Sequence, residues 1–368
     1  MTASLPSAPR QFGSLLIVRL GAMGDIIHAL PAVAALRQAF PSANLGWLVE
    51  ERWAELLCTS SYSLSGPRSP QRPLVDCVHT VTTKQWRHAP LSFNTWQQIG
   101  SNVRQLRDVH YDAVIDFQGA IRSALLARWS GAPVVYGYTK PREGAAIIFY
   151  SRKITTNRAH VVEQAIELVE AVIAKPTVPA PFQFPVDPDA ETKVAAITAT
   201  GKSFAILNPG AGWGAKRWPP ERYAQVAREL AKDGLCSFIN YGPGEGDLAE
   251  AVEKASAGTA RRVSCSISEL VALTRRASLF VGGDTGPMHL AAALKIPVVA
   301  IFGPTNPARN GPFRTRSVVL RSASSVTDHS RHREPEQGLL EITAEEVVAG
   351  ARKLLATEAA NQVSEESK

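Results

Sequence analysis

Short apolar runs alternate with longer amphipathic stretches along the whole chain. The first run is Leu-Leu-Ile-Val-Arg at residues 15–19, and a helical apolar pattern follows at residues 26–40, which Pro31 should kink. The same order of a strand-like run and then a helix-like segment continues to residue 355. This alternation predicts an α/β fold, in which parallel sheets are covered by helices on both faces.

The individual elements follow from the same pattern. It predicts strands at residues 15–19, 45–49, 113–116, 134–136, 204–208, 236–241, 279–282 and 298–302. It predicts helices at residues 26–40, 52–57, 96–107, 121–129, 160–174, 221–232, 247–256, 268–276, 286–294 and 343–355, with Ser268 as the N-cap of its helix. Residues 60–73 are rich in Ser, Pro and Arg and predict a loop, which we expect to be mobile.

A proline-rich stretch separates two halves of this pattern. Five prolines lie within residues 175–188, and neither a helix interior nor a central strand accommodates them. We therefore predict an N-terminal domain at residues 1–178, a linker at 179–190 and a C-terminal domain at 191–342. A terminal helix and a disordered tail are expected at residues 343–368.

Composition limits the class of protein. The 368 residues are 45% hydrophobic and 20% charged, which is ordinary for a globular protein. No apolar run approaches the roughly 18 residues of a membrane helix, and residues 1–14 do not read as a signal peptide, so we expect a cytoplasmic protein. The four cysteines are far apart and form no Cys-x-x-Cys pair, so neither a zinc site nor a redox motif is indicated.

Charge is distributed unevenly. The formal net charge is +7, and residues 1–186 hold 18 Lys and Arg against 12 Asp and Glu, so +6 of it lies in the N-terminal half. Such a surplus serves solubility, or it attracts an anionic substrate or an anionic membrane surface. Nucleic acid is not an expected partner, because no recognised binding motif or dense basic run is present.

The most informative motif is Gly-Gly-Asp-Thr-Gly-Pro-Met-His-Leu at residues 282–290. It lies between a strand and a helix, where Asp284 or Thr285 can cap the helix and Pro287 suits its first turn. The free N–H groups and the helix dipole of such a turn make a site for phosphate. His289 is either a packed residue or, as we expect beside Asp284, a polar residue of the binding cleft.

A second turn of similar design follows the first strand. Its sequence Gly-Ala-Met-Gly-Asp, which ends at Asp25, lacks the dinucleotide-binding spacing and so disfavours a dehydrogenase. Asp25 either caps the following helix or points into a cleft as a carboxylate base.

Two further strand ends carry charged residues. Lys216 and Arg217 follow a glycine-rich turn and are either solvated or a clamp for a diphosphate. Glu245 lies in another such turn, where its carboxylate can accept hydrogen bonds from ribose hydroxyls.

Together these segments resemble the ADP-heptose glycosyltransferases of lipopolysaccharide core assembly, glycosyltransferase family nine. The resembling segments are residues 17–25, 28–31, 111–119, 142–145, 149–153, 208–219, 282–290 and 303–305. Residues 142–153 are most similar to the first heptosyltransferase subgroup.

The resemblance implies a GT-B fold, with two Rossmann-like domains facing a cleft and the C-terminal helix crossing back to the N-terminal domain. It also implies an inverting transfer of L-glycero-D-manno-heptose from ADP-heptose to a Kdo residue of Kdo-lipid A, with no metal and no other cofactor. The enzyme would work on the cytoplasmic face of the inner membrane as a peripheral protein.

Residue by residue, the resemblance implies that Asp25 is the catalytic base. It implies that the donor is bound by Lys216, Glu245, Asp284, Thr285, Gly286 and His289. It also implies that the acceptor is bound by Arg122 and Gln118. The family often has a polar pair before the diphosphate lysine, where this chain has Gly214-Ala215, so backbone N–H groups would have to replace those hydroxyls.

Two alternatives stay open. The chain can be another member of the family with a different acceptor, such as the second heptosyltransferase or a relative that modifies protein. It can also be a nucleotide-sugar-binding module without turnover.

Overall fold

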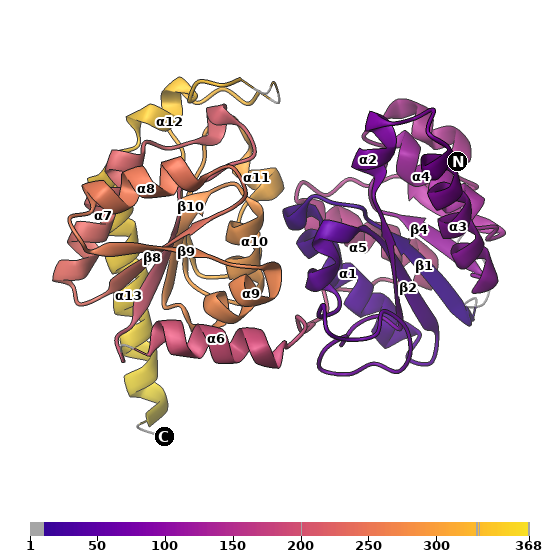
Figure 1. The fold of residues 1–368 in the computed structure, drawn as a ribbon, viewed down its shortest axis with the longest axis horizontal. Coiled ribbons are helices and arrows are strands. Elements are labelled where there is room, and N and C mark those ends of the chain that lie inside the picture. Colours follow the sequence, from indigo (N-terminus) through magenta and orange to yellow (C-terminus); the bar gives the residue numbers. More distant parts are fainter. Residues whose placement is uncertain (1–10, 200, 329, 331, 367–368) are drawn as a thin grey trace. The chain divides into compact units, whose positions relative to one another are not determined.

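The computed structural model describes residues 11–366 except residues 200, 329 and 331 (Figure 1). Internal contacts divide the chain into two compact units, one that ends at Val186 and one that begins at Asp187. This division falls inside the proline-rich linker that the sequence predicts.

The first unit is built on a six-stranded parallel sheet with the order β3-β2-β1-β4-β5-β6. Its strands are β1 (Ser14–Val18), β2 (Asn44–Glu50), β3 (Cys77–Val81), β4 (Ala113–Asp116), β5 (Val134–Tyr138) and β6 (Arg152–Ile154). Its helices are α1 (Met23–Ala39), η1 (Glu51–Leu56), α2 (Thr83–His88), α3 (Phe93–Asp108), α4 (Ile121–Trp129), η2 (Gly144–Phe149) and α5 (Val161–Ile173). Helix α1 runs through Pro31 as one helix.

The second unit contains another six-stranded parallel sheet, with the order β12-β11-β10-β7-β8-β9. Its strands are β7 (Phe204–Asn208), β8 (Cys236–Tyr241), β9 (Ala260–Ser264), β10 (Leu279–Gly283), β11 (Val298–Ile301) and β12 (Ser317–Leu320). Its helices are α6 (Pro188–Thr198), η3 (Gly214–Lys216), α7 (Pro220–Lys232), α8 (Gly246–Ala255), α9 (Ile267–Arg276), α10 (Gly286–Ala293), α11 (Pro307–Asn310), α12 (Gln337–Glu341) and α13 (Ala344–Glu366). The predicted α/β class is therefore confirmed.

Both sheets have one strand order when the strands of each unit are counted from its first, namely 3-2-1-4-5-6. All strands are parallel, but successive strands are added to one side of β1 up to β3 and to its other side from β4 on. The same change in the order of strands occurs between β7 and β10. Ligands of such sheets bind beyond the carboxyl ends of the strands at this change of order. Candidate site residues follow all four of the strands concerned. In the first unit Asp25 follows β1 and Gln118 follows β4, and in the second unit Lys216 follows β7 and Asp284 follows β10.

Sequence reasoning missed the strands β3, β6, β9 and β12 and the helices α2, η2, α6, η3, α11 and α12. Strand β9 shows why, since its Ala-Arg-Arg-Val-Ser sequence lies at the edge of the sheet and exposes Arg261 and Arg262. Such a strand gives no continuous apolar run. Helix α6 begins inside the predicted linker, where Asp187 accepts hydrogen bonds from the N–H groups of Asp189 (3.0 Å) and Ala190 (3.1 Å).

The loop at residues 60–73, which we expected to be mobile, is tied together by one buried arginine. The Arg72 side chain is fully buried and donates hydrogen bonds to carbonyl oxygens of the loop and of the segment after it, those of Ser63, Gly66, Pro67 and Val75. A guanidinium has five N–H donors in a fixed fork, so it can hold several carbonyls at once. The sequence showed the Ser and Pro content of this loop but not the hydrogen bonds that hold it together.

Helix α13 packs within the second unit, and its expected crossing to the N-terminal domain stays a prediction. It packs on α7 and on strands β10, β11 and β12 of the second sheet. Its buried apolar side chains, Val347, Val348, Ala351 and Leu354, belong to one core cluster with residues of α7 and of that sheet. Because this face is apolar and covers the sheet, the described part of α13 is an element of the second unit. Among the described residues, no helix has the length and apolar character to cross a membrane.

Candidate functional site

The Asp25 carboxylate lies in the first turn of α1, directly beyond the carboxyl end of β1. One carboxylate oxygen is 2.8 Å from Nη2 of Arg19, and the other accepts a hydrogen bond from the Ala22 N–H at 3.1 Å. Its side chain is still 37% exposed. The group thus has a partner at each oxygen and is still partly exposed, so support of the helix start is compatible with access by a ligand.

Gln118 connects the turns that follow β1 and β4. Its side-chain oxygen accepts hydrogen bonds from the N–H groups of Leu20 (3.1 Å) and Gly21 (3.4 Å), and the residue is buried. Arg19 also donates a hydrogen bond to the Phe117 carbonyl oxygen. These bonds fix the loop that leads to Asp25, which is a supporting role that the sequence did not reveal for Gln118.

Asp116, the last residue of β4, is fully buried and holds the turn that contains Gln118. Its carboxylate accepts hydrogen bonds from the Gln118 N–H (2.8 Å), the Ser123 hydroxyl (3.0 Å) and the Tyr150 hydroxyl (2.8 Å). Burial raises the pKa of Asp116 above its usual range, although these bonds act in the opposite direction. We interpret Asp116 as a structural acid that orders the turn. Sequence reasoning assigned it no role, and its place at the end of an apolar strand was the available signal.

Arg122 occupies the first turn of α4 and is exposed. The preceding residue, Ile121, donates its N–H to the Glu143 carboxylate at 2.8 Å. The carboxyl edge of the first sheet therefore carries an accessible guanidinium as well as the Asp25 carboxylate.

In the second unit, Lys216, Asp284 and His289 form a largely buried polar cluster. Lys216 Nζ donates to Asp284 Oδ2 at 2.6 Å, and His289 Nε2 is 3.1 Å from Asp284 Oδ1. Burial by itself would raise the pKa of Asp284, but the hydrogen bond and charge of His289 and the charge of Lys216 outweigh it and hold that pKa well below its usual range. Asp284 is thus a fixed anion that positions both the Lys216 ammonium group and the His289 ring.

This arrangement corrects the expected capping role of Asp284 and Thr285. Thr285 is the N-cap residue of α10, but neither side chain makes a capping hydrogen bond. The Thr285 hydroxyl instead lies 3.5 Å from Asn208 Nδ2 and donates to the Gly283 carbonyl oxygen at 3.3 Å. The N-terminus of α10, which begins at Gly286, therefore has no side-chain cap, and its dipole favours an anion there.

Glu245 lies beside the turn that follows β7. Its carboxylate accepts a hydrogen bond from the Gly242 N–H at 2.8 Å. A Cβ atom at Gly210 would lie 2.0 Å from Glu245 Oε2, so only glycine fits against this carboxylate in its present position. The second sheet thus brings together Glu245, the turn after β7 and the turn after β10.

The segment after β12 closes over Gly214-Ala215, a contact that sequence reasoning missed. The Ala215 N–H donates to the His332 carbonyl oxygen at 3.1 Å, and the Glu336 N–H donates to the Ala215 carbonyl oxygen at 3.2 Å. A Cβ atom at Gly214 would lie 1.6 Å from the Arg333 carbonyl oxygen. A larger residue at position 214 therefore has no room.

Replacing Gly214 with serine is expected to lower the free energy of unfolding by about 1–3 kcal/mol, because the clash is with backbone that must move. Thermal or denaturant unfolding measures the effect. Gly212→Ser is the matched control, since a Cβ atom at Gly212 meets nothing within 4 Å. Equal stabilities of the two variants would contradict this account of the turn.

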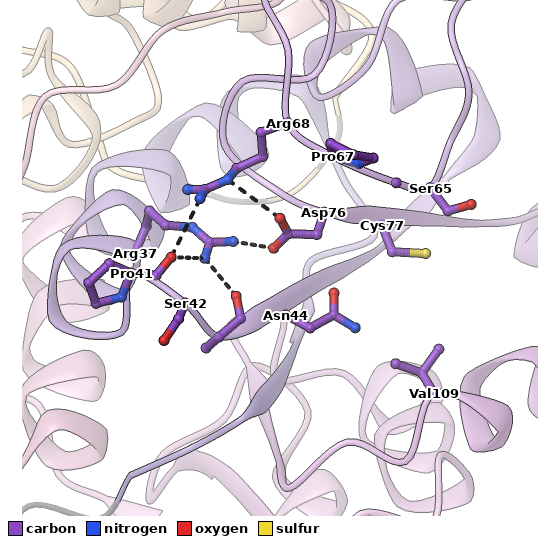
Figure 2. A pocket seen from close by; sticks show the side chains of 12 residues that line it. Arg37, Pro41, Ser42, Asn44, Ser65, Pro67, Arg68, Asp76, Cys77 and Val109 are labelled. Carbon is purple, nitrogen blue, oxygen red and sulfur yellow. Dashed lines mark hydrogen bonds and ion pairs between the residues drawn. The ribbon is translucent and has the colours of Figure 1, made fainter.

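A pocket of about 490 Å³ in the first unit is not part of this site (Figure 2). It lies at the amino-terminal ends of β2 and β3, beside Asn44 and Cys77, and so at the opposite edge of the sheet from Asp25. Its two arginines, Arg37 and Arg68, both pair with Asp76, as the dashed lines of Figure 2 show. Their charge is thus partly matched within the protein. Among the described residues, no group of three His, Cys, Asp or Glu side chains is placed to hold a metal ion.

Comparison with known proteins identifies the class. The profile of glycosyltransferase family 9 (heptosyltransferase) matches residues 99–339. Lipopolysaccharide heptosyltransferase 1 of Pseudomonas aeruginosa is 30% identical over 321 residues, which cover 84% of this chain and 83% of that protein. The corresponding protein of Escherichia coli K12 is 27% identical, over 84% of this chain and 93% of that protein.

Solved structures agree. The E. coli heptosyltransferase WaaC with ADP-2-deoxy-2-fluoro heptose has a TM-score of 0.72 and 26% identity, over 92% of this chain and 99% of that one. A family 9 glycosyl transferase from Veillonella parvula has a TM-score of 0.78 at 21% identity, over 94% of this chain and 98% of that one, and supports the fold alone. The protein is thus a glycosyltransferase with the predicted GT-B fold class. The chain belongs to glycosyltransferase family 9, the heptosyltransferases, as the sequence motifs indicated.

Proposed function

We propose that this protein transfers L-glycero-D-manno-heptose from ADP-heptose to a Kdo residue of Kdo-lipid A, in lipopolysaccharide core synthesis. The observation that carries the proposal is that one chain holds both kinds of group that such a transfer needs. The accessible Asp25 carboxylate suits the acceptor hydroxyl, and Lys216 beside the N-terminus of α10 suits a departing diphosphate. The likeness to heptosyltransferase 1 proteins and to a structure with an ADP-heptose analogue supports this choice of substrates.

In the proposed mechanism, Asp25 accepts the proton of the acceptor hydroxyl as that oxygen attacks the anomeric carbon of the heptose. The oxygen approaches from the face opposite the departing ADP, so the anomeric configuration inverts. Arg19 orients the carboxylate before the reaction, since it already contacts one of its oxygens at 2.8 Å.

The other half of the reaction is stabilisation of the ADP that leaves. Charge on its diphosphate grows as the glycosidic bond breaks, and Lys216 and the N-terminus of α10 are oriented in advance to meet it. Glu245 is assigned to the adenosine ribose, and Thr285, Gly286 and His289 to the rest of the donor-binding turn. In this scheme the protein supplies the positive charge, and no metal takes part.

ADP release tests the proposal. We expect purified protein to release ADP from ADP-heptose when Kdo-lipid A is added, and EDTA to leave the rate unchanged. Donor binding without ADP release in any acceptor mixture would instead indicate a non-catalytic binding module. Release only with an acceptor that already carries a heptose, or with a protein acceptor, would assign the chain to another member of the family. Loss of activity in EDTA that magnesium restores would contradict the metal-free scheme.

We place the anionic acceptor on the first unit, because the charge surplus lies there and Arg122 is exposed at its carboxyl edge. Arg122→Glu is expected to raise the KM for the acceptor about tenfold or more, since hydrogen bonds to charged groups are typically worth about 1.5–3 kcal/mol. The KM for ADP-heptose should change little. Steady-state kinetics with each substrate varied separately measures both constants.

Arg128→Glu is the matched control, because Arg128 is also exposed on α4 but lies in its last turn. It should leave both constants near those of the unmodified protein. If Arg122→Glu changed only the donor KM, the assignment of the acceptor to the first unit would be wrong.

A further inference from the structure

Three large apolar side chains within six residues are exposed where α2 leads into α3. Leu91 is 94% exposed, Phe93 80% and Trp96 58%. We call these three residues the apolar tip. Most large exposed apolar side chains of a soluble protein occur singly, and a cluster generally marks a surface that binds something.

The local structure forces these side chains outward. At this end of α3 the buried position is Thr95, whose hydroxyl donates to the Ala89 carbonyl oxygen at 2.8 Å. Trp86 Nε1 donates to Gln98 Oε1 at 3.1 Å and further joins α2 to α3. Phe93 and Trp96 are three residues apart and so share a face of the helix, and that face points away from these bonds. The first turn of α3 thus has a polar inner side and an apolar outer side.

The apolar tip is flanked by positive charge. Lys84 and Arg87 lie on α2 and Arg104 on α3, all three are exposed, and none forms an ion pair with another described residue. The sequence contains no Asp or Glu between Asp76 and Asp108. Leu, Phe and Trp side chains beside Lys and Arg are the composition of segments that lie in the headgroup region of anionic bilayers. Charge complementarity therefore favours an anionic lipid surface over another apolar protein surface.

The apolar tip lies at the same edge of the first sheet as Asp25 and Arg122. Helix α2 follows the carboxyl end of β3, and α3 leads back to the start of β4, so its first turn is at the carboxyl edge. Helices α3 and α4 are in contact, which places Arg122 on a neighbouring element. A bilayer bound at the apolar tip would thus be on the side of the unit where we place the acceptor.

We propose that Leu91, Phe93 and Trp96 insert into the headgroup region of an anionic phospholipid bilayer, while Lys84, Arg87 and Arg104 contact lipid phosphates. Lipid binding itself does not depend on the enzyme's reaction. Only the consequence that binding brings a lipid-borne acceptor to Arg122 rests on the proposed function.

Vesicle binding by the full chain tests the proposal. With vesicles of phosphatidylglycerol and phosphatidylcholine, we expect Leu91→Ser/Phe93→Ser to weaken partitioning by a factor on the order of 100, as follows from removing two inserted apolar side chains. Val178→Ser/Val326→Ser is the matched control, because these valines are 68% and 67% exposed outside the apolar tip. It should partition like the unmodified protein, and thermal unfolding should show that both variants fold.

Two further measurements locate the contact. Brominated lipid should quench part of the tryptophan fluorescence of the unmodified protein, and Trp96→Phe should remove most of that quenching. Lys84→Glu/Arg87→Glu should weaken binding and reduce its dependence on salt, because exposed charges are screened over about 8–10 Å at physiological ionic strength. Binding should disappear with vesicles of phosphatidylcholine alone.

Several outcomes would overturn the proposal. One is that the Leu91→Ser/Phe93→Ser variant partitions onto vesicles as strongly as the unmodified protein. Another is that the unmodified protein does not bind anionic vesicles at all. A third is that sedimentation shows a dimer of the unmodified protein that this variant abolishes. Equal transfer rates of variant and unmodified protein to a water-soluble Kdo acceptor would support it, and a loss there would instead place the apolar tip in the active site. Vesicle binding at the apolar tip without any heptose transfer would reject the proposed function and leave this inference standing.

Discussion

Replacing Asp25 with asparagine should lower the rate of heptose transfer by about 100-fold or more, while ADP-heptose binding changes little. Asparagine keeps the shape of the side chain and an oxygen that can accept the Ala22 N–H, so the start of α1 should survive. It cannot take up the proton of the acceptor hydroxyl. Single-turnover transfer rates and calorimetric donor binding measure the two effects separately.

The chain offers a control for this experiment at the other end of the same strand. Asp112 accepts hydrogen bonds from the N–H groups of Gly13 (2.7 Å) and Ser14 (2.8 Å) at the start of β1. Asp112→Asn removes a carboxylate with a similar supporting role but at the opposite edge of the sheet, and it should transfer heptose at nearly the normal rate. Near-normal transfer by Asp25→Asn would reduce Asp25 to a support for the helix and remove the proposed base.

Replacing Lys216 with alanine should both weaken ADP-heptose binding and slow transfer, with a loss in kcat on the order of 100-fold. The lysine meets charge that increases as the bond breaks, so its removal affects the transition state more than the bound donor. Lys216→Arg keeps the charge and should retain more activity than alanine. Steady-state kinetics and ADP binding measure these changes.

Lys216 also compensates the buried Asp284, so stability must be followed in the same variants. Thermal unfolding shows whether Lys216→Ala still folds, and Lys295→Ala is a control for loss of a lysine. Lys295 lies just beyond the other end of α10, where it donates to the Arg314 carbonyl oxygen at 2.9 Å. A Lys216→Ala protein that folds and transfers heptose at a normal rate would exclude this lysine from leaving-group stabilisation.

The central strands and the turns that carry the site were predictable because their signals are local. Strand β1 is an apolar run, buried at Leu15, Leu16, Ile17 and Val18, and a glycine-containing turn follows it directly. The same holds for β10 and the turn at Asp284. Position at the carboxyl end of a parallel strand then brought the charged residues to one edge of each sheet.

The partners of those residues were not predictable in this way. Asp284 looked like a helix cap because only its neighbours in sequence were visible, whereas its lysine partner is 68 residues away. The resemblance assigns Gln118 to acceptor binding, and nothing in the sequence indicated that its oxygen also binds the backbone 97–98 residues earlier.

One local signal was misread. The N-cap of α9 is Ser266, not Ser268, and Ser266 and Glu269 exchange side-chain hydrogen bonds with each other's N–H groups at 3.2 Å and 2.9 Å. The Ser-x-x-Glu spacing that indicates such a capping box was present in the sequence.

Lys216 is paired with Asp284, so an anion that bound to this lysine would have to compete with the Asp284 carboxylate. The ammonium group is already neutralised by a carboxylate at 2.6 Å, so an isolated phosphate gains only the difference between two similar ion pairs. A ligand that also reaches the end of α10 and Glu245 adds interactions that the internal pair does not oppose. As the proposed donor site, this turn would discriminate against small phosphates before any sugar is recognised, because Asp284 already holds the lysine that they would bind.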